Sequence, residues 1–148
     1  MIRRSAALTI SVLICAGGAA AEEHTINMLT SGDSGSMVFE PAFVKVAVGD
    51  TVVFNPVAPN QFHNSASQFL PEGAASWSST FDTEFRLTVE TEGVYIYSCV
   101  PHQGMGMVGV IQAGAATNLA EAKTAAEELS SKMFQHKERL AAAIAQIN

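Results

Sequence analysis

The stretch "GVYIYSCVPHQGMGMVGVIQA", residues 93–113, holds two apolar runs on either side of a short mixed segment. The runs, 93–98 and 107–113, are rich in the β-branched and aromatic residues that favour strands. Between them, a cysteine, a histidine and two methionines fall within the nine positions from Cys99 to Met107. The stretch therefore predicts a two-stranded hairpin whose loop gathers a thiol, an imidazole and thioethers.

The chain before this hairpin reads as further short strands. Apolar or alternating runs occupy 24–29, 37–41, 85–89 and 43–57, the last broken at the turn pair Gly49-Asp50. No helical period precedes residue 116. Short strands separated by turns predict a mainly β chain, folded as an antiparallel sandwich or barrel.

Residues 58–82 interrupt this pattern. They are rich in small and polar residues, have no clear period and contain His63. A long irregular segment inside a compact domain is often functional. We therefore expect His63 to contribute to a site.

The tail, residues 117–148, changes to a helical period. Asn118 followed by Glu121 is typical of a helix N-cap and its partner three residues on. Apolar stripes with Ser130-Ser131 between them predict two amphipathic helices packed on the sheet. Their core-facing residues are Leu119, Ala122, Ala126 and Leu129 in the first, and Met133, Leu140, Ile144 and Ile147 in the second.

The first 21 residues have the pattern of a secretory signal peptide: a basic start, an apolar stretch and small residues at 17–21. The apolar run is shorter than the roughly 20 residues of a spanning helix, which favours cleavage over a retained anchor. The residues after Arg3-Arg4 favour the general secretory route over the twin-arginine route, and Ile14 before Cys15 argues against a lipoprotein. We expect residues 22–148 to form a single domain, free of the membrane, in the periplasm.

The exported chain would be acidic and would hold one thiol. Without Arg3 and Arg4, six basic residues face fourteen acidic ones, a net charge of −8, and no basic run indicates nucleic-acid binding. Cys15 leaves with the leader, so Cys99 remains alone in an oxidising compartment. An unpaired cysteine there is a liability unless it is buried, bridged to another chain or held as a metal thiolate.

Cys99, His102, a methionine and the distant His63 together predict a copper site. A thiolate, two imidazoles and a weak axial thioether are the donors of blue-copper electron-transfer sites. Zinc could bind the thiolate and imidazoles but has no use for the thioether. Spacing alone leaves Met105 and Met107 equally suitable.

Other functions fit these residues less well. Cys99 as a nucleophile with a histidine base and Asn64 would leave both methionines unexplained. A copper enzyme would need a further centre, and only His24 and His136 remain, both of which read as structural. A periplasmic copper chaperone or storage protein is the more serious alternative, although it would usually carry more methionines and no committed thiolate. We expect no enzyme activity.

The chain resembles the cupredoxins, and within them the pseudoazurins, in "GSMVFEPAFVKVAVGDTVVF" (35–54), "HN" (63–64), "SCVPHQGMGM" (98–107) and the helical tail. The resemblance implies a Greek-key β-sandwich with two C-terminal α-helices and one type 1 copper ion cycling between Cu²⁺ and Cu⁺. By position, it also implies the ligands His63, Cys99, His102 and Met107. The second methionine of the Met-Gly-Met sequence aligns with the family's ligand, which separates Met107 from Met105.

The same resemblance implies roles for neighbouring residues. Asn64 aligns with the residue that ties the first ligand loop to the cysteine loop, and Met37 aligns with a methionine near a ligand imidazole. Pro101 has no N–H to offer, and its ring fixes φ and so stiffens the loop. The implied electron exit is the edge of His102, within a docking patch that includes Pro41, Gly104, Met105 and Gly106.

The implied function is one-electron transfer, by a monomer, between periplasmic redox proteins such as copper nitrite reductase and c-type cytochromes. One departure matters for docking. Pseudoazurins commonly carry lysines around the patch, but "APNQFHN" and "VPHQGMGM" contain none. Steering toward an acidic partner would then involve Lys45, Arg86 or the helical lysines, or the partner surface is not acidic.

Overall fold

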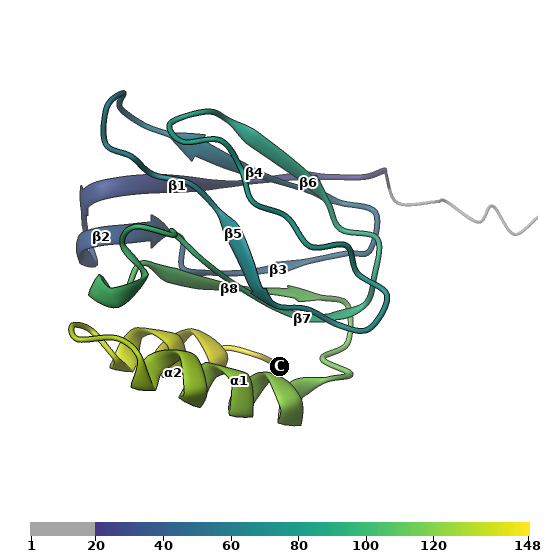
Figure 1. Cartoon of the computed structure of the whole chain (residues 1–148). Helices are drawn as coiled ribbons and strands as arrows, with labels where there is room; N and C mark the ends of the chain where they lie inside the picture. The colour runs from purple at the N-terminus through teal and green to yellow at the C-terminus, as the bar shows by residue number, and fades with distance from the viewer. Residues whose placement is uncertain (1–19) are drawn as a thin grey trace, which may run out of the picture.

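The computed structural model describes residues 20–148, so the expected signal peptide lies outside the described residues except for its last two positions. Within 20–148 the chain forms two four-stranded sheets and two C-terminal helices (Figure 1). The order is β2-β1-β4-β6 in the first sheet and β3-β8-β7-β5 in the second. The bounds are β1 Glu23–Gly32, β2 Gly35–Glu40, β3 Phe43–Val46, β4 Thr51–Pro56, β5 Ala66–Phe69, β6 Phe85–Thr88, β7 Gly93–Ser98, β8 Val108–Ala113, α1 Leu119–Ser131 and α2 Glu138–Ile144.

All the predicted strands are present, which confirms the mainly β fold, but the sequence missed β5. This strand, "ASQF", lies inside the segment 58–82 that we expected to be irregular. It is short and carries no apolar alternation. It forms because it pairs antiparallel with β7, from Ala66 opposite Ser98 to Phe69 opposite Ile96. Its partner, and not its own pattern, makes it a strand.

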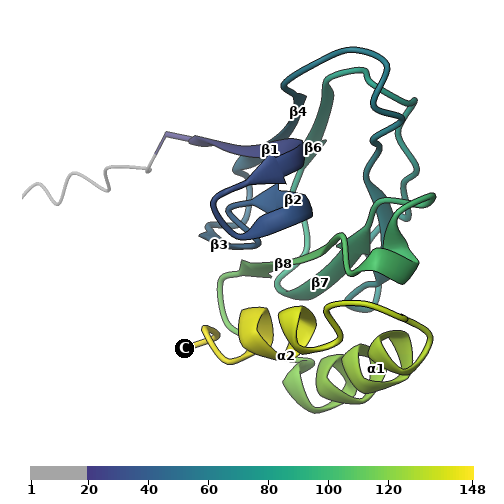
Figure 2. The same cartoon turned by 90° about the vertical axis from the view of Figure 1, so that its left-hand side faces the viewer.

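The sheets are mixed, whereas the pattern predicted antiparallel ones. β1 runs parallel to β4, and β3 runs parallel to β8. After β2 the chain leaves the first sheet and β3 joins the edge of the second (Figure 2). The consecutive strands β2 and β3, and likewise β3 and β4, therefore lie in different sheets, and a local pattern does not encode the resulting pairings.

The β7–β8 hairpin is buried on both faces, and every residue of both strands is buried. Tyr95 and Tyr97 face the core between the sheets, where the Tyr97 ring lies edge-on to Phe39 at 4.8 Å and to Phe54 at 4.9 Å. Val94 and Ile96 face the opposite way, toward the helices. A strand covered on both sides reads as a continuous apolar run, as this one does.

The helices α1 and α2 cover the outer face of the second sheet (Figure 2). The predicted stripes are confirmed as the packing faces: Ala122, Ala126, Leu129, Met133, Leu140 and Ile144 are buried. Met133 lies in the connection between the helices and not in either helix. No helix within residues 20–148 is long and apolar enough to cross a membrane.

Asn118 is the N-cap residue of α1, as predicted, but its side chain makes no capping hydrogen bond. Its Oδ1 accepts the Val94 N–H at 2.7 Å, and its Nδ2 donates to the Val94 carbonyl oxygen at 3.1 Å. Val94 lies beyond the end of β5, so that strand offers its backbone no partner. The Asn118 side chain takes the place of the missing strand and fastens the start of the tail to β7.

We expect Asn118→Ala to lower the free energy of unfolding by about 1–3 kcal/mol, because both Val94 backbone groups would lose their partner in a half-buried position. Thermal or urea unfolding of the metal-free protein measures the change. The control is Thr124→Ala in α1, whose exposed hydroxyl donates only to Ala120 of its own helix. Equal effects of the two substitutions would contradict the assigned role of Asn118.

Candidate metal centre

The cysteine loop is closed by its own backbone. Cys99 directly follows β7 and Met107 directly precedes β8. The Cys99 N–H donates to the Met107 carbonyl at 3.0 Å, and the Met107 N–H donates to the His102 carbonyl at 3.2 Å. The His102 N–H in turn donates to the Cys99 carbonyl at 3.1 Å. The spacing of Cys99, His102 and Met107 thus forms one compact turn with fixed ends.

Three donor atoms converge at this turn. The Cys99 Sγ lies 3.4 Å from His102 Nδ1 and 3.9 Å from His63 Nδ1. The two Nδ1 atoms are 3.2 Å apart, and the rings are inclined at 70°. Cys99 and His63 are buried, and His102 is half-buried. A thiol and two imidazole nitrogens within 4.8 Å of one another are a set that can hold a metal ion.

The two methionines differ in position. Met107 is fully buried, in the same apolar cluster as Cys99. Met105 is half-buried and lies in a short 3₁₀ helix, Gln103–Met105. Of the two thioethers, Met107 is the one enclosed with the thiol.

The tautomer of His63 is set by Thr30. The Thr30 hydroxyl donates to Gln61 Oε1 at 2.7 Å, so its oxygen accepts the proton on His63 Nε2, 3.0 Å away. The lone pair of His63 Nδ1 is therefore free to face Cys99. Partners that fix a ligand imidazole in this way are a feature of metal sites. No sequence pattern marks Thr30 or Gln61 as part of the site.

The ionisation of the donors suits a metal ion. Burial, followed by the charge of His102, lowers the pKa of His63, and burial lowers the pKa of His102. Burial raises the pKa of the Cys99 thiol, against the opposing hydrogen bond from the Asn64 N–H. Near neutral pH the metal-free site therefore holds two neutral imidazoles and a protonated thiol, whose proton a binding cation displaces.

Asn64 joins the two ligand segments. Its Oδ1 accepts the Val100 N–H at 2.9 Å, and its Nδ2 donates to the Ser79 carbonyl at 3.3 Å. Its backbone N–H points to the Cys99 sulfur at 3.5 Å. Asn64 is buried, so these contacts are shielded from water.

Asp82 holds the His63 segment, and the sequence analysis missed it. Its carboxylate accepts the backbone N–H groups of Gln61, Phe62 and His63 at 3.0–3.1 Å. Burial tends to raise the pKa of Asp82, but these three hydrogen bonds outweigh it and lower the pKa. No local pattern marks this residue, because its partners lie 19 to 21 positions earlier in the chain.

The other expected site residues differ in their burial. Met37, half-buried with a φ of 50°, packs against the core cluster that contains Cys99 and Met107. Pro101 and Pro41 are exposed. Gly104 is half-buried, and a Cβ there would lie 2.4 Å from the Phe134 ring.

Gly106 does not belong to a docking surface, contrary to expectation. It is buried, and a Cβ there would lie 2.8 Å from that of His136. His136 itself is exposed and lies 3.5 Å from Glu138, while His24 bonds to Asp50. Neither histidine belongs to the donor cluster.

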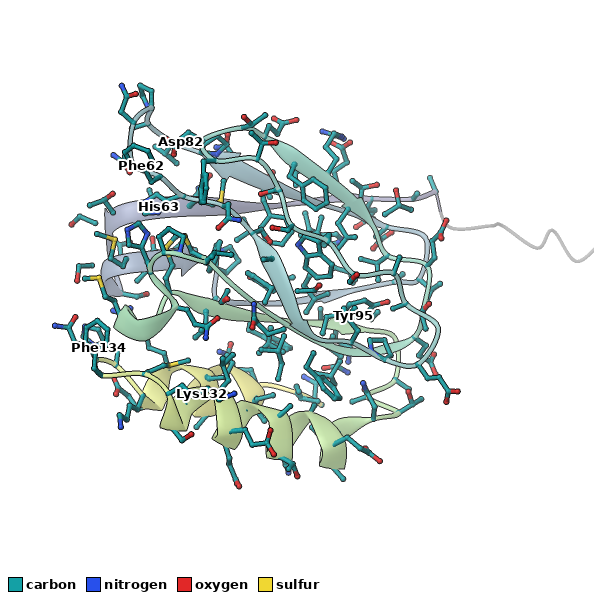
Figure 3. All side chains as sticks on the ribbon, viewed as in Figure 1. Phe62, His63, Asp82, Tyr95, Lys132 and Phe134 are labelled. Atoms are coloured by element: carbon teal, nitrogen blue, oxygen red, sulfur yellow. The ribbon has the colours of Figure 1, made fainter. Side chains whose placement is uncertain are left out.

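Exposed apolar side chains flank the cluster, and the sequence analysis did not identify them. Phe62, next to His63, is 63% exposed, and Val100, next to Cys99, is 53% exposed. Phe134 is 71% exposed, and its N–H donates to the Gly104 carbonyl at 2.9 Å. Figure 3 shows Phe62, His63 and Phe134 at the same end of the molecule.

This fold and these donors define a class: a two-sheet β-sandwich with a blue-copper type of donor set at one end. The family model for copper-binding proteins of the plastocyanin/azurin family matches residues 26–114. The chain belongs to this family, and within it to the pseudoazurins, and copper is its cofactor.

The relatives cover nearly the whole chain. A pseudoazurin of Paracoccus pantotrophus is 40% identical over 144 residues, which span 97% of this chain and 96% of the relative. The solved pseudoazurin of Hyphomicrobium denitrificans is 37% identical with a TM-score of 0.71, over 85% of this chain and 98% of its own. That of Methylobacterium extorquens AM1 is 34% identical with a TM-score of 0.73, over 85% and 99%.

We expect Asp82→Asn to destabilise the protein and weaken copper binding. The amide retains only one accepting oxygen for three N–H donors, a loss of about 1–3 kcal/mol for a charge-assisted bond. Thermal unfolding of the metal-free protein and copper titration measure the two effects. Glu84→Gln, an exposed carboxylate two residues away, is the matched control. Unchanged copper affinity in Asp82→Asn would contradict the role given to this carboxylate.

Proposed function

We propose that the chain is a periplasmic one-electron carrier whose single copper ion is held by His63, Cys99, His102 and Met107. The observation that carries this proposal is the convergence of the Cys99 sulfur and two imidazole nitrogens beside an enclosed Met107. Copper bound there supplies a Cu²⁺/Cu⁺ couple, which exchanges one electron at a time.

The surrounding residues hold the donors in one arrangement. Asn64 links the His63 segment to Val100, Asp82 fixes the backbone before His63, and Thr30 fixes its ring. Donors that are already in place need little movement when an electron arrives or leaves. This rigidity supports a carrier, since reorganisation slows electron transfer.

The rigidity argues against a copper chaperone or storage protein. A protein that hands over its ion must expose its donors to the acceptor. Here the thiol is fully buried and Met107 is enclosed. We assign no catalytic activity to the chain.

The exit for the electron is His102. His63 is 1% exposed, whereas His102 is half-buried and therefore the imidazole that a partner can approach. Phe62, Val100 and Phe134 extend the apolar patch expected from Met105, Gly104 and Pro41. Such a surface suits the weak, short-lived contacts of a shuttle between redox proteins, of which copper nitrite reductase and c-type cytochromes are our candidates.

The periplasmic location rests on residues 1–21, which have the composition of a cleaved signal peptide. A lone thiol in an oxidising compartment is open to oxidation unless it is protected. Binding as a metal thiolate would protect Cys99, so an exported copper protein can carry a single cysteine. We propose that the chain docks to its partners as a monomer.

The copper assignment is tested on residues 22–148. With Cu²⁺ we expect an intense visible absorption that bleaches on reduction and is lost in Cys99→Ser. We expect Met107→Leu to shift both the absorption and the reduction potential, because the axial donor tunes them. Met105→Leu, equal in chemistry and two residues away, is the control and should leave both unchanged. A colourless wild type, or the reverse behaviour of the two methionines, would contradict the proposal.

The docking surface is tested by Phe134→Ala. We expect the second-order rate of electron exchange with a c-type cytochrome to fall about fivefold or more, because exposed aromatic anchors often contribute more than 1 kcal/mol to contacts. The absorption and potential should not change. Val48→Ala is the control, since Val48 is 48% exposed and lies in the β3–β4 turn at the other end of the molecule (Figure 1). Equal rates in both variants would place docking elsewhere.

A further inference from the structure

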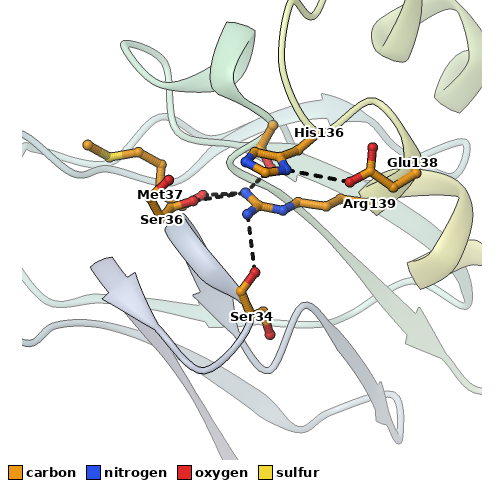
Figure 4. Close-up of polar contacts among 7 residues, drawn as sticks. Ser34, Ser36, Met37, His136, Glu138 and Arg139 are labelled. Carbon is orange, nitrogen blue, oxygen red and sulfur yellow. Dashed lines mark hydrogen bonds and ion pairs between the residues drawn. The ribbon is translucent and has the colours of Figure 1, made fainter.

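Arg139, in the first turn of α2, inserts its guanidinium between two other segments (Figure 4). Nη1 carries two N–H groups and donates to three carbonyl oxygens, those of Met37 at 2.9 Å, Ser36 at 3.0 Å and Gly106 at 3.3 Å, so one N–H is shared between two acceptors. Nη2 donates to the Ser34 carbonyl at 3.3 Å. One side chain of the tail thus bridges the β1–β2 hairpin and the cysteine loop.

The charged guanidinium of Arg139 donates hydrogen bonds to backbone carbonyl groups. In the described part of the chain no carboxylate forms an ion pair with it. The Oε1 atom of its neighbour Glu138 instead lies 3.5 Å from Nδ1 of His136 (Figure 4). Hydrogen bonds from an ionised donor are roughly twice as strong as neutral ones. A half-buried guanidinium with four carbonyl partners is a strong, directional link between the segments.

Both ends of this link lie beside the proposed copper ligands. Gly106 directly precedes Met107. Met37 packs against the cluster that contains Cys99 and Met107, and its backbone has a φ of 50°. A positive φ is unfavourable for a side chain of this size and persists only where the surroundings hold it. The bond from Arg139 to the Met37 carbonyl is one such restraint.

The cysteine loop also lies directly against the helix connection. The N–H groups of Phe134 and Gln135 both donate to the Gly104 carbonyl, at 2.9 and 3.2 Å. Gly106 has a φ of 79° and leaves no room for a Cβ beneath His136. The loop is therefore fixed to the tail at Gly104 and again at Gly106, with Arg139 making the second attachment.

We propose that Arg139 is a positioning residue for the metal centre. By joining the Met37 and Gly106 carbonyls, it sets where Met37 and the thioether of Met107 lie relative to Cys99. The tail thereby tunes the absorption and potential of the site in addition to covering the sheet. This inference rests on the proposed copper function, and in particular on Met107 as a ligand.

The test compares Arg139→Met and Arg139→Lys with Arg86→Met in the full exported chain loaded with Cu²⁺. Arg139→Met removes the charge and all four bonds. Arg139→Lys keeps the charge, but a single ammonium does not reproduce the planar fork. Arg86 is the matched control, because its exposed guanidinium on β6 pairs with Glu23 and Glu84, away from the cysteine loop. The readouts are the visible spectrum, the reduction potential and the thermal unfolding of the metal-free protein.

We expect Arg139→Met to change the relative intensities of the visible bands and to shift the potential. Arg139→Lys should fold and show a smaller spectral change of the same kind. Arg86→Met should leave spectrum and potential as in the wild type. If Arg139→Met does not fold, the spectral change in Arg139→Lys alone carries the test.

Two results would overturn the inference while leaving the copper function intact. One is a coloured Arg139 variant with lowered thermal stability but a wild-type spectrum and potential, which would show that Arg139 has only a structural role. The other is a wild-type spectrum and potential in Arg139→Lys, which would show that the charge of Arg139 matters and the position of its hydrogen bonds does not. A colourless wild type would instead refute the proposed function, and this inference with it.

Discussion

The burial of the β7–β8 hairpin on both faces is the constraint on which the rest of the structure depends. One face of the hairpin completes the core between the sheets, and the other carries the two helices. Neither strand can shift without disturbing both layers, because packed interiors tolerate little displacement. The loop between the strands therefore has fixed ends, and these ends restrict the movement of the donor atoms of Cys99 and His102. A site whose donors hardly move is what an electron carrier requires.

The same constraint explains how much could be predicted from sequence. A strand buried on both sides is mostly apolar, so 93–98 and 107–113 stand out despite the buried polar residues Ser98 and Gln112, and the residues between them read directly as a loop. The two tail helices can also be predicted from sequence, because each helix has one buried face and therefore one apolar stripe. Strand pairings that depend on where the chain crosses between sheets cannot be predicted in this way. The strand β5 has no apolar pattern of its own, and the parallel pairs β1/β4 and β3/β8 depend on which sheet the chain enters after β2.

The candidate site divides in the same way. Cys99, His102 and the two methionines are close in sequence, and His63 stands out as a histidine in an irregular segment. The residues that support them are ordinary polar side chains whose partners are distant: Thr30 lies 33 positions before His63, and Asp82 lies 19 after it. Asn118 is an intermediate case. Its local motif correctly predicts the N-cap position of α1, but its side chain bonds to the backbone of Val94, which is distant in sequence, and not to the helix.

The tail combines a structural role with roles at the ligand loop. Its buried face covers the sheet, its connection bonds to Gly104, and Arg139 bonds to Gly106. Residues 132–139 also carry three of the six basic residues of the exported chain and only one of its fourteen acidic ones. The positive charge missing from the two ligand loops is therefore concentrated in the segment that also presents Phe134. Because the remainder of the chain is strongly acidic, an acidic partner is repelled from most of the surface and is repelled least on this side. Support of the ligand loop and orientation of the partner would then reside in one short segment, so substitutions there must be tested for both effects separately.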